Sequence, residues 1–190
     1  MVKDVKISPV NWGFDTYMTL LAVRRQFDEM ISSFSSAATR NDLPSLLRVG
    51  SLAALANTYM IKGDRAGALP FRAQAEKNRR ALQNQERLPP MMYAFFIEME
   101  ARFGDRDAVK RDVKNLFEQT EKDKWEFPNS EVSAAVGYML LGDFDRALPF
   151  LQDALSHPSE TSITPSNLRL SPIWDPIRSD PRFQKLVGKQ

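Results

Sequence analysis

The chain has 190 residues, of which 26 are lysine or arginine and 24 are aspartate or glutamate, so the formal net charge is +2. This near balance gives no argument for a nucleic-acid partner, and no apolar run approaches the roughly 20 residues that a membrane-spanning helix needs. The sequence contains no cysteine, which excludes a disulfide framework, a thiolate zinc site and a cysteine nucleophile.

These features predict a cytoplasmic protein that binds neither nucleic acid nor membrane. Residues 1–6 lack the apolar core of a secretory signal, and the absence of cysteine fits a reducing compartment. The densest basic run, at 72–87, is diluted by Glu76 and Glu86 and is typical of a solvated helix face.

Helix is predicted almost throughout, because valine, isoleucine and threonine do not cluster in the alternating runs that mark strands. The first predicted helix covers about residues 15–39, where apolar residues recur at steps of three and four, the period of a helix with one buried face. These residues are Tyr17, Leu20, Leu21, Phe27, Met30, Ile31 and Phe34. Asn41 and Asp42 are expected to end this helix and to cap the next one.

An internal repeat follows. The phrase Gly-Asp-Arg-Ala-Gly-Ala-Leu-Pro-Phe at 63–71 returns as Gly-Asp-Phe-Asp-Arg-Ala-Leu-Pro-Phe at 142–150, and a degenerate copy lies at 104–109. The first glycines of the three copies are 41 and 38 residues apart. A repeat of this length predicts an array of similar helix pairs, each of which buries its apolar face by stacking on a neighbour.

Each copy predicts the junction inside one helix pair. The glycine is expected to end the first helix, because glycine adopts a left-handed conformation at the lowest cost. The aspartate that follows is expected at the start of the second helix, where negative charge is favourable. The three pairs are predicted at about 46–83, 91–120 and 130–158.

A capping segment is predicted at about 166–187. Its apolar residues Trp174, Ile177 and Phe183 lie between prolines and can cover the apolar end of the third pair, as a terminal unit of a repeat array must. The whole chain, 1–190, is therefore predicted to form a single domain.

The third pair resembles the tetratricopeptide repeat, or TPR. Its residues that match the TPR pattern are Ala135, Tyr138, Gly142, Ala147, Leu151, Ala154 and Pro158. The matching residues of the first pair are Ala56, Tyr59, Gly63, Ala68 and Ala75. The first pair departs from the pattern at Arg72, where a large apolar residue is expected. The second pair departs at Ile97, Glu100 and Val109.

This resemblance implies an all-α, TPR-like antiparallel helix-pair solenoid with an extra N-terminal helix and a C-terminal capping segment. The tail at 168–184 is also similar to the end of TPR regions in bacterial multidomain signalling proteins, which carry kinase, nucleotide-cyclase or winged-helix domains. We therefore expect a bacterial regulatory module whose partner is a protein or peptide. The sequence contains no Gly-rich phosphate loop and no kinase signature.

In TPR domains the first helix of each pair lines a concave groove, and the resemblance implies that a partner peptide or helix binds there. The positions that would face this groove are Ala53, Asn57, Met60, Ala94, Glu98, Arg102, Val132, Val136 and Met139. Asn57 matches the asparagine with which peptide-clamping members hold a ligand backbone. Ala53, Ala94 and Val132 stand where the basic residues of a carboxylate clamp would be.

Such an apolar groove is suited to an amphipathic helix or an extended apolar peptide. In the alternative interpretation, the first helix or the tail of the chain itself fills the groove.

No constellation of nucleophile, base and orienting group can be assembled from the sequence, so we expect neither enzymatic activity nor a cofactor. The single histidine, His157, is predicted at a helix end in a surface or capping role, and one histidine cannot build a metal site without other ligands. Glu98 and Glu100 are two residues apart, so they lie on different faces of a helix and do not form a carboxylate pair.

Two other functions stay open at this point. In a ligand-sensing domain, a small molecule or peptide would fill a cavity lined by Asn57, Glu98 and Arg102. In a homo-oligomerisation module, which includes a homo-dimer, Trp125 and Phe127 would form the contact from an exposed loop.

Overall fold

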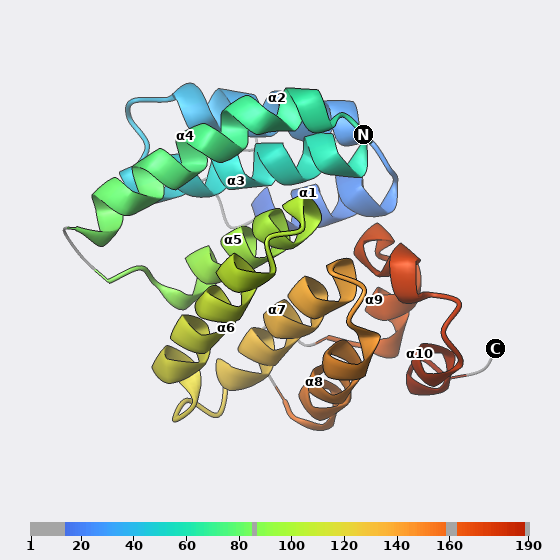
Figure 1. Ribbon diagram of the computed structural model, residues 1–190. Coiled ribbons are helices and arrows are strands. Elements are labelled where there is room, and N and C mark those ends of the chain that lie inside the picture. The colour runs from blue at the N-terminus through green and yellow to red at the C-terminus, as the bar shows by residue number, and fades with distance from the viewer. Residues whose placement is uncertain (1–13, 85–86, 159–162, 189–190) are drawn as a thin grey trace. The chain divides into compact units, whose positions relative to one another are not determined.

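The computed structural model of the chain describes residues 14–84, 87–158 and 163–188, and every regular element within them is a helix (Figure 1). The elements are α1 (Phe14–Val23), α2 (Phe27–Thr39), α3 (Ser45–Ile61), α4 (Arg65–Gln83), α5 (Pro90–Phe103), α6 (Arg106–Thr120), α7 (Phe127–Leu140), α8 (Phe144–Ser156), α9 (Pro165–Leu170), the 3-10 helix η1 (Pro172–Ile177) and α10 (Pro181–Leu186). The predicted all-α class is therefore confirmed. No helix among the described residues combines the length and the apolar character that a membrane crossing needs.

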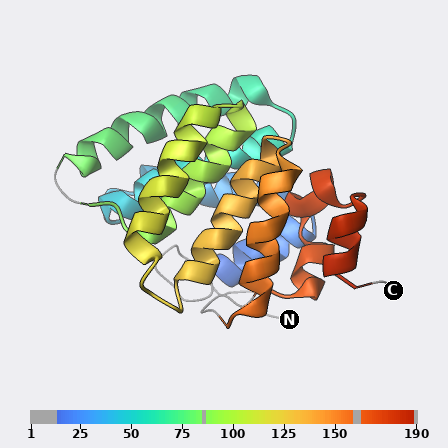
Figure 2. The ribbon, with the colours of Figure 1, turned by 60° about the horizontal axis from the view of Figure 1, so that its bottom comes forward.

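The described residues form two compact units, one ending at Asn84 and the other beginning at Arg87. In the N-terminal unit, α1 packs on α2, α2 on α3 and α3 on α4. In the C-terminal unit, α5 packs on α6 and α7, and α7 packs on α8 (Figure 2). Whether the chain behaves as one domain stays a prediction.

The prediction of one long helix at 15–39 is wrong, because the structure has two helices there. Helix α1 ends in a Schellman motif, in which the Gln26 amide donates to the Leu21 carbonyl at 2.9 Å and the Arg25 amide to the Ala22 carbonyl at 3.0 Å. Arg25 takes the left-handed position of this motif, with φ of 57°. Residues 24–26 contain neither glycine nor proline, so the sequence carries no indication that the helix ends there.

The same junction joins the two helices of the pairs α3/α4, α5/α6 and α7/α8. Gly63, Gly104 and Gly142 occupy the left-handed position of a Schellman motif, with φ of 79°, 82° and 77°. A Cβ atom built on any of the three would meet nothing within 4 Å. The backbone conformation, rather than a shortage of space, therefore favours glycine at these positions.

An aspartate then caps the second helix of each pair. Oδ1 of Asp64, Asp105 and Asp143 accepts a hydrogen bond from the amide three residues further on, at 2.8, 3.0 and 3.3 Å. This is the usual geometry of an N-cap, which satisfies one of the unpaired amides of the first turn. The repeated phrase thus encodes one structural device, a helix stop followed directly by a helix start.

Aromatic stacking holds the first and third pairs together in the same way. Tyr59 stacks on Phe71 with ring centroids 5.4 Å apart, and Tyr138 stacks on Phe150 at 6.1 Å. The second pair has Glu100 at the position of the tyrosine, and this side chain is buried. At this position the second pair therefore differs from the other two in packing as well as in sequence.

Within the C-terminal unit, the third pair packs closely on the second. A Cβ on Gly137 of α7 would lie 2.5 Å from Cγ2 of Ile97 and 3.1 Å from Cγ1 of Val109. The absence of a side chain at Gly137 thus permits the close approach of α7 to α5 and α6. Arg106 adds a polar link, because its Nη2 donates to the Leu141 carbonyl at 2.8 Å.

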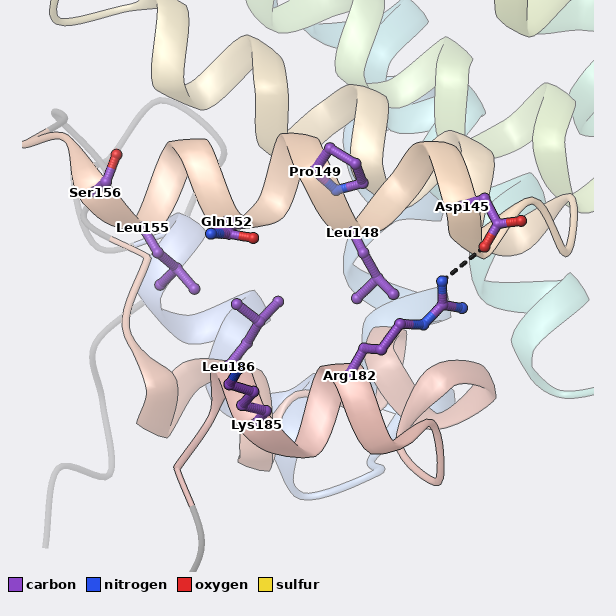
Figure 3. Close-up of a pocket in the computed structure, with 9 residues that line it drawn as sticks. All are labelled: Asp145, Leu148, Pro149, Gln152, Leu155, Ser156, Arg182, Lys185 and Leu186. Carbon is purple, nitrogen blue, oxygen red and sulfur yellow. Dashed lines mark hydrogen bonds and ion pairs between the residues drawn. The ribbon is translucent and has the colours of Figure 1, made fainter.

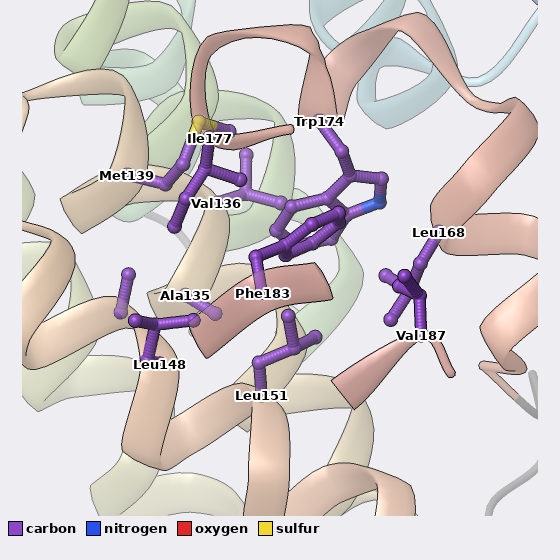
Figure 4. Close-up of a cluster of buried hydrophobic side chains, with 11 residues drawn as sticks. Ala135, Val136, Met139, Leu148, Leu151, Leu168, Trp174, Ile177, Phe183 and Val187 are labelled. Atoms are coloured by element: carbon purple, nitrogen blue, oxygen red, sulfur yellow. The ribbon is translucent and has the colours of Figure 1, made fainter. Parts of the chain in front are cut away.

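The C-terminal segment packs on the third pair and completes its core (Figure 4). Trp174, Ile177 and Phe183 are buried against side chains of α7 and α8, and the rings of Trp174 and Phe183 stack with centroids 6.1 Å apart. Phe183 has no exposed surface. These are the three apolar residues that the sequence suggests for a cap.

Arg178 fixes the path of this segment. Its Nη2 donates to the Ser171 carbonyl at 2.9 Å and to Asp175 Oδ1 at 2.7 Å, and its Nη1 donates to the carbonyls of Leu168 and Arg169. One guanidinium thus satisfies carbonyl groups at and just after the end of α9, which a helix terminus otherwise leaves unpaired.

Candidate binding surfaces

The predicted groove residues of the N-terminal unit lie on α3, and most of their surface is buried. Ala53 is 0% exposed and Asn57 is 4% exposed, whereas Met60 is half-buried. Every residue of α3 from Val49 to Thr58 is buried, which is the pattern of a helix that is covered all round. In this structure α3 therefore offers little side-chain surface to a partner.

The predicted groove residues on α5 are more accessible. Ala94, Glu98 and Arg102 are half-buried. Nε and Nη2 of Arg102 both donate to Oε1 of Glu98, at 3.0 and 2.8 Å. This pair follows from the four-residue spacing of the two side chains on one helix face, and it neutralises both charges locally.

The predicted groove residues on α7 contact the chain's own C-terminal segment. Val136 and Met139 are buried in the same cluster as Trp174 and Ile177, and Val132 packs against that cluster (Figure 4). At the third pair, the tail therefore covers these positions, as the alternative interpretation describes. A partner would reach Met139, which is 1% exposed, only by displacing the tail.

A groove of about 600 Å³ lies between α8 and α10 and is not among the predicted sites (Figure 3). The residues that line it are Asp145, Leu148, Pro149, Gln152, Leu155, Ser156, Arg182, Lys185 and Leu186. Leu148, Leu155 and Leu186 form its apolar part, and Gln152 lies between Leu148 and Leu155 on α8. The groove exists because α10 returns to α8, which no local pattern in the sequence predicts.

Of the two cations that line this groove, Arg182 forms two ion pairs and Lys185 forms none with the described residues. Arg182 Nη1 lies 2.7 Å from Asp145 Oδ1, and Arg182 Nη2 lies 2.9 Å from Asp180 Oδ2. Hydrogen bonding to Arg182 holds the pKa of Asp180 below its ordinary value, and the same two carboxylates raise the pKa of Arg182. Within the described part of the chain, Lys185 has no ion-pair partner.

A buried carboxyl group was also not predicted. Glu131 of α7 is 4% exposed, and its Oε2 accepts no hydrogen bond from the residues that the structure describes. Burial, together with the neighbouring Asp153 of α8, raises the pKa of Glu131 to about 8. Glu131 does not line the groove between α8 and α10, so we interpret it as a feature of helix packing.

His157 lies exposed at the end of α8, where its Nδ1 is 3.0 Å from the Asp153 carbonyl and 3.1 Å from Ser156 Oγ. This location agrees with the predicted surface or capping role. In residues 14–84, 87–158 and 163–188, no group of three or more histidine or carboxylate side chains is arranged to hold a metal ion.

The two aromatic residues expected in one exposed loop lie in different surroundings. Trp125 is 63% exposed in the turn between α6 and α7. Phe127 instead begins α7 and is half-buried, with its ring centroid 5.2 Å from that of Phe117. The expectation that both are exposed in the loop is therefore wrong for Phe127.

Comparison with models of protein families, with characterised proteins and with solved structures found no match to this chain.

Proposed function

We propose that this chain is a TPR-like helix-pair solenoid that acts as a protein–protein interaction module. The observation that carries this proposal is the junction shared by α3/α4, α5/α6 and α7/α8, in which a Schellman glycine is followed directly by an N-cap aspartate. Three copies of one device favour a repeat array, and repeat arrays act through extended surfaces rather than enclosed catalytic pockets. A regulatory role in a bacterial signalling protein follows from the resemblance of the tail.

Within the predicted groove, the α5 face is the part that we propose for the partner. Ala94, Glu98 and Arg102 retain exposed surface, whereas the α7 positions lie beneath the tail. A bound peptide or helix would contact Ala94 and exchange hydrogen bonds with the Glu98–Arg102 pair. This proposal assigns the chain a binding role, without catalysis and without a cofactor.

The test is affinity capture from bacterial lysate with the double variant Glu98→Lys/Arg102→Glu. The exchange keeps an i,i+4 ion pair and the net charge, but it reverses the order of the charges that a partner meets. A matched control is Lys114→Glu/Glu118→Lys, which reverses the exposed i,i+4 pair of α6. We expect wild type and control to retain the same protein and the α5 variant to lose it, with circular dichroism unchanged in all three.

Equal retention by all three proteins would exclude the α5 face as the site. A specific partner for none of them, over repeated lysates and salt concentrations, would contradict the proposed function itself.

Self-association is the second candidate function, and the exposure of Trp125 favours it. A tryptophan with 63% of its surface exposed on a helix-to-helix turn is a frequent anchor of protein interfaces. In this candidate the partner is a second copy of the chain.

A further inference from the structure

We infer that the groove between α8 and α10 is a second docking surface, and that its occupant is an acidic amphipathic segment of a partner protein. It adds to the proposed interaction module a site that is distinct from the α5 face. The argument depends on the shape of the groove, on its apolar residues and on Lys185, which has no ion-pair partner among the described residues.

The apolar residues define the spacing of side chains that the occupant must supply. Leu148 and Leu155 are seven residues apart on α8, which is two helical turns, or about 10 Å. Leu186 projects toward them from α10 (Figure 3). An occupant with two apolar side chains about 10 Å apart fits this row, as i and i+7 do on one face of a helix.

Six of the nine lining residues are exposed, so the groove is open to solvent along its length. Small-molecule sites bury most of the ligand surface, about 70–90%, which an open groove does not do. A peptide segment can bind in such a groove because only one of its faces needs to be buried. Gln152, which lies between Leu148 and Leu155 on α8, offers an amide donor and acceptor to the occupant's backbone.

One lysine of the groove favours an acidic side chain in the occupant. Asp145 already pairs with Arg182, and Asp180 holds the other side of the same guanidinium. Lys185, adjacent to Leu186, is the lining cation that lacks an ion-pair partner among the described residues. A carboxylate beside the apolar side chains of the occupant would pair with Lys185.

The test begins with selection of random 12-residue peptides, displayed on phage, against the full chain. We expect the selected peptides to be enriched in aspartate or glutamate next to leucine, isoleucine or phenylalanine. Fluorescein-labelled copies would then be titrated by fluorescence anisotropy against wild type and variants. Binding should weaken as salt is added, because the pair with Lys185 is exposed.

The decisive variant is Lys185→Glu, which changes an exposed side chain and leaves the core intact. We expect it to weaken binding of the acidic peptides about threefold to fivefold, and to bind better than wild type those copies in which lysine replaces glutamate. Leu155→Ala and Leu186→Ala should each weaken binding about fivefold or more. The matched control is Lys110→Glu on the exposed face of α6, which should bind as wild type does.

Selection without acidic enrichment, a failure to select any peptide, or equal binding by wild type and Lys185→Glu would each overturn this inference. Peptides whose binding is lost in Glu98→Lys/Arg102→Glu but kept in Lys185→Glu would place them on the α5 face. That outcome would remove the α8–α10 site and leave the proposed function standing.

Discussion

Gly142 illustrates how a single residue sets a helix end. Its φ of 77° lies in the region that residues with a side chain rarely adopt, although the space around it is open. Arg25 occupies the same kind of position with φ of 57°, which shows that the chain tolerates a side chain there at some energetic cost. The cost of a side chain at Gly142 arises from the backbone conformation alone. A substitution there therefore measures this cost without adding a steric clash.

We predict that Gly142→Ala lowers the free energy of unfolding by about 1 kcal/mol, because alanine is disfavoured in the left-handed region. Gly142→Asn should cost less, because asparagine populates this region more readily. Urea unfolding followed by circular dichroism would measure both changes. Equal stability of Gly142→Ala and wild type would show that the junction relaxes to another backbone conformation.

Glu131 predicts a dependence of stability on pH. Its pKa is raised to about 8 in the folded chain from an ordinary value of 4.5. Between these values the folded chain binds one more proton than the unfolded chain, so the free energy of unfolding falls as the pH rises. The slope is at most about 1.4 kcal/mol per pH unit. Below about pH 4.5 and above about pH 8, this group contributes no slope.

We therefore expect Glu131→Gln to be as stable as wild type near pH 5 and more stable at pH 8, by at least about 1 kcal/mol. The amide stays neutral and can donate a hydrogen bond to Asp153, as the protonated carboxyl does. Glu118→Gln, at an exposed position of α6, is the matched control and should follow wild type. A stability difference that is constant from pH 5 to pH 8 would contradict the assignment.

At the scale of elements, the C-terminal segment behaves as part of the core rather than as an attached tail. Leu168 of α9, Trp174 of η1 and Phe183 of α10 all belong to the cluster formed by α7 and α8. Each element is short, with six residues in each of α9, η1 and α10, and helices of this length are not stable in isolation. Their order must come from packing on the third pair.

We predict that Phe183→Ala lowers the stability of the C-terminal unit by about 3–5 kcal/mol, since it removes a fully buried ring. Phe183→Leu should retain most of the packing and lose less. Hydrogen exchange read by mass spectrometry should show lost protection in α9, η1 and α10 first. Unchanged protection of these elements in Phe183→Ala would mean that the ring does not hold the segment.

The sequence predicted the features that depend on local chemistry. Gly142 and Asp143 specify a helix end and a helix start through their own backbone and side-chain preferences, so the sequence alone predicts this junction. The break at Arg25 was missed because an arginine in a left-handed conformation has no local signature. The α8–α10 groove was missed because it depends on where Leu186 returns in space, which is set by packing between distant segments.

At the scale of the whole molecule, self-association can be tested through solution mass. If Trp125 forms the contact, the mass should rise above the 21.7 kDa of one chain as concentration increases. Trp125→Ser should then stay at the mass of one chain. Leu170→Ser is the control, because Leu170 is similarly exposed, at 62%, on α9. Sedimentation velocity of the three proteins would measure this, and a constant monomer mass for wild type would rule out the candidate.

The burial of Trp174 and Phe183 also affects whether chains can stack end to end. An uncovered end of a helix-pair array is an apolar surface that the start of another array can cover, and head-to-tail contacts of this kind do not close, so they propagate into filaments. Here η1 and α10 cover the apolar side chains of α7 and α8 with side chains of the same chain. In the repeat array that we propose, this coverage would leave no apolar surface at the third pair on which a further chain could stack.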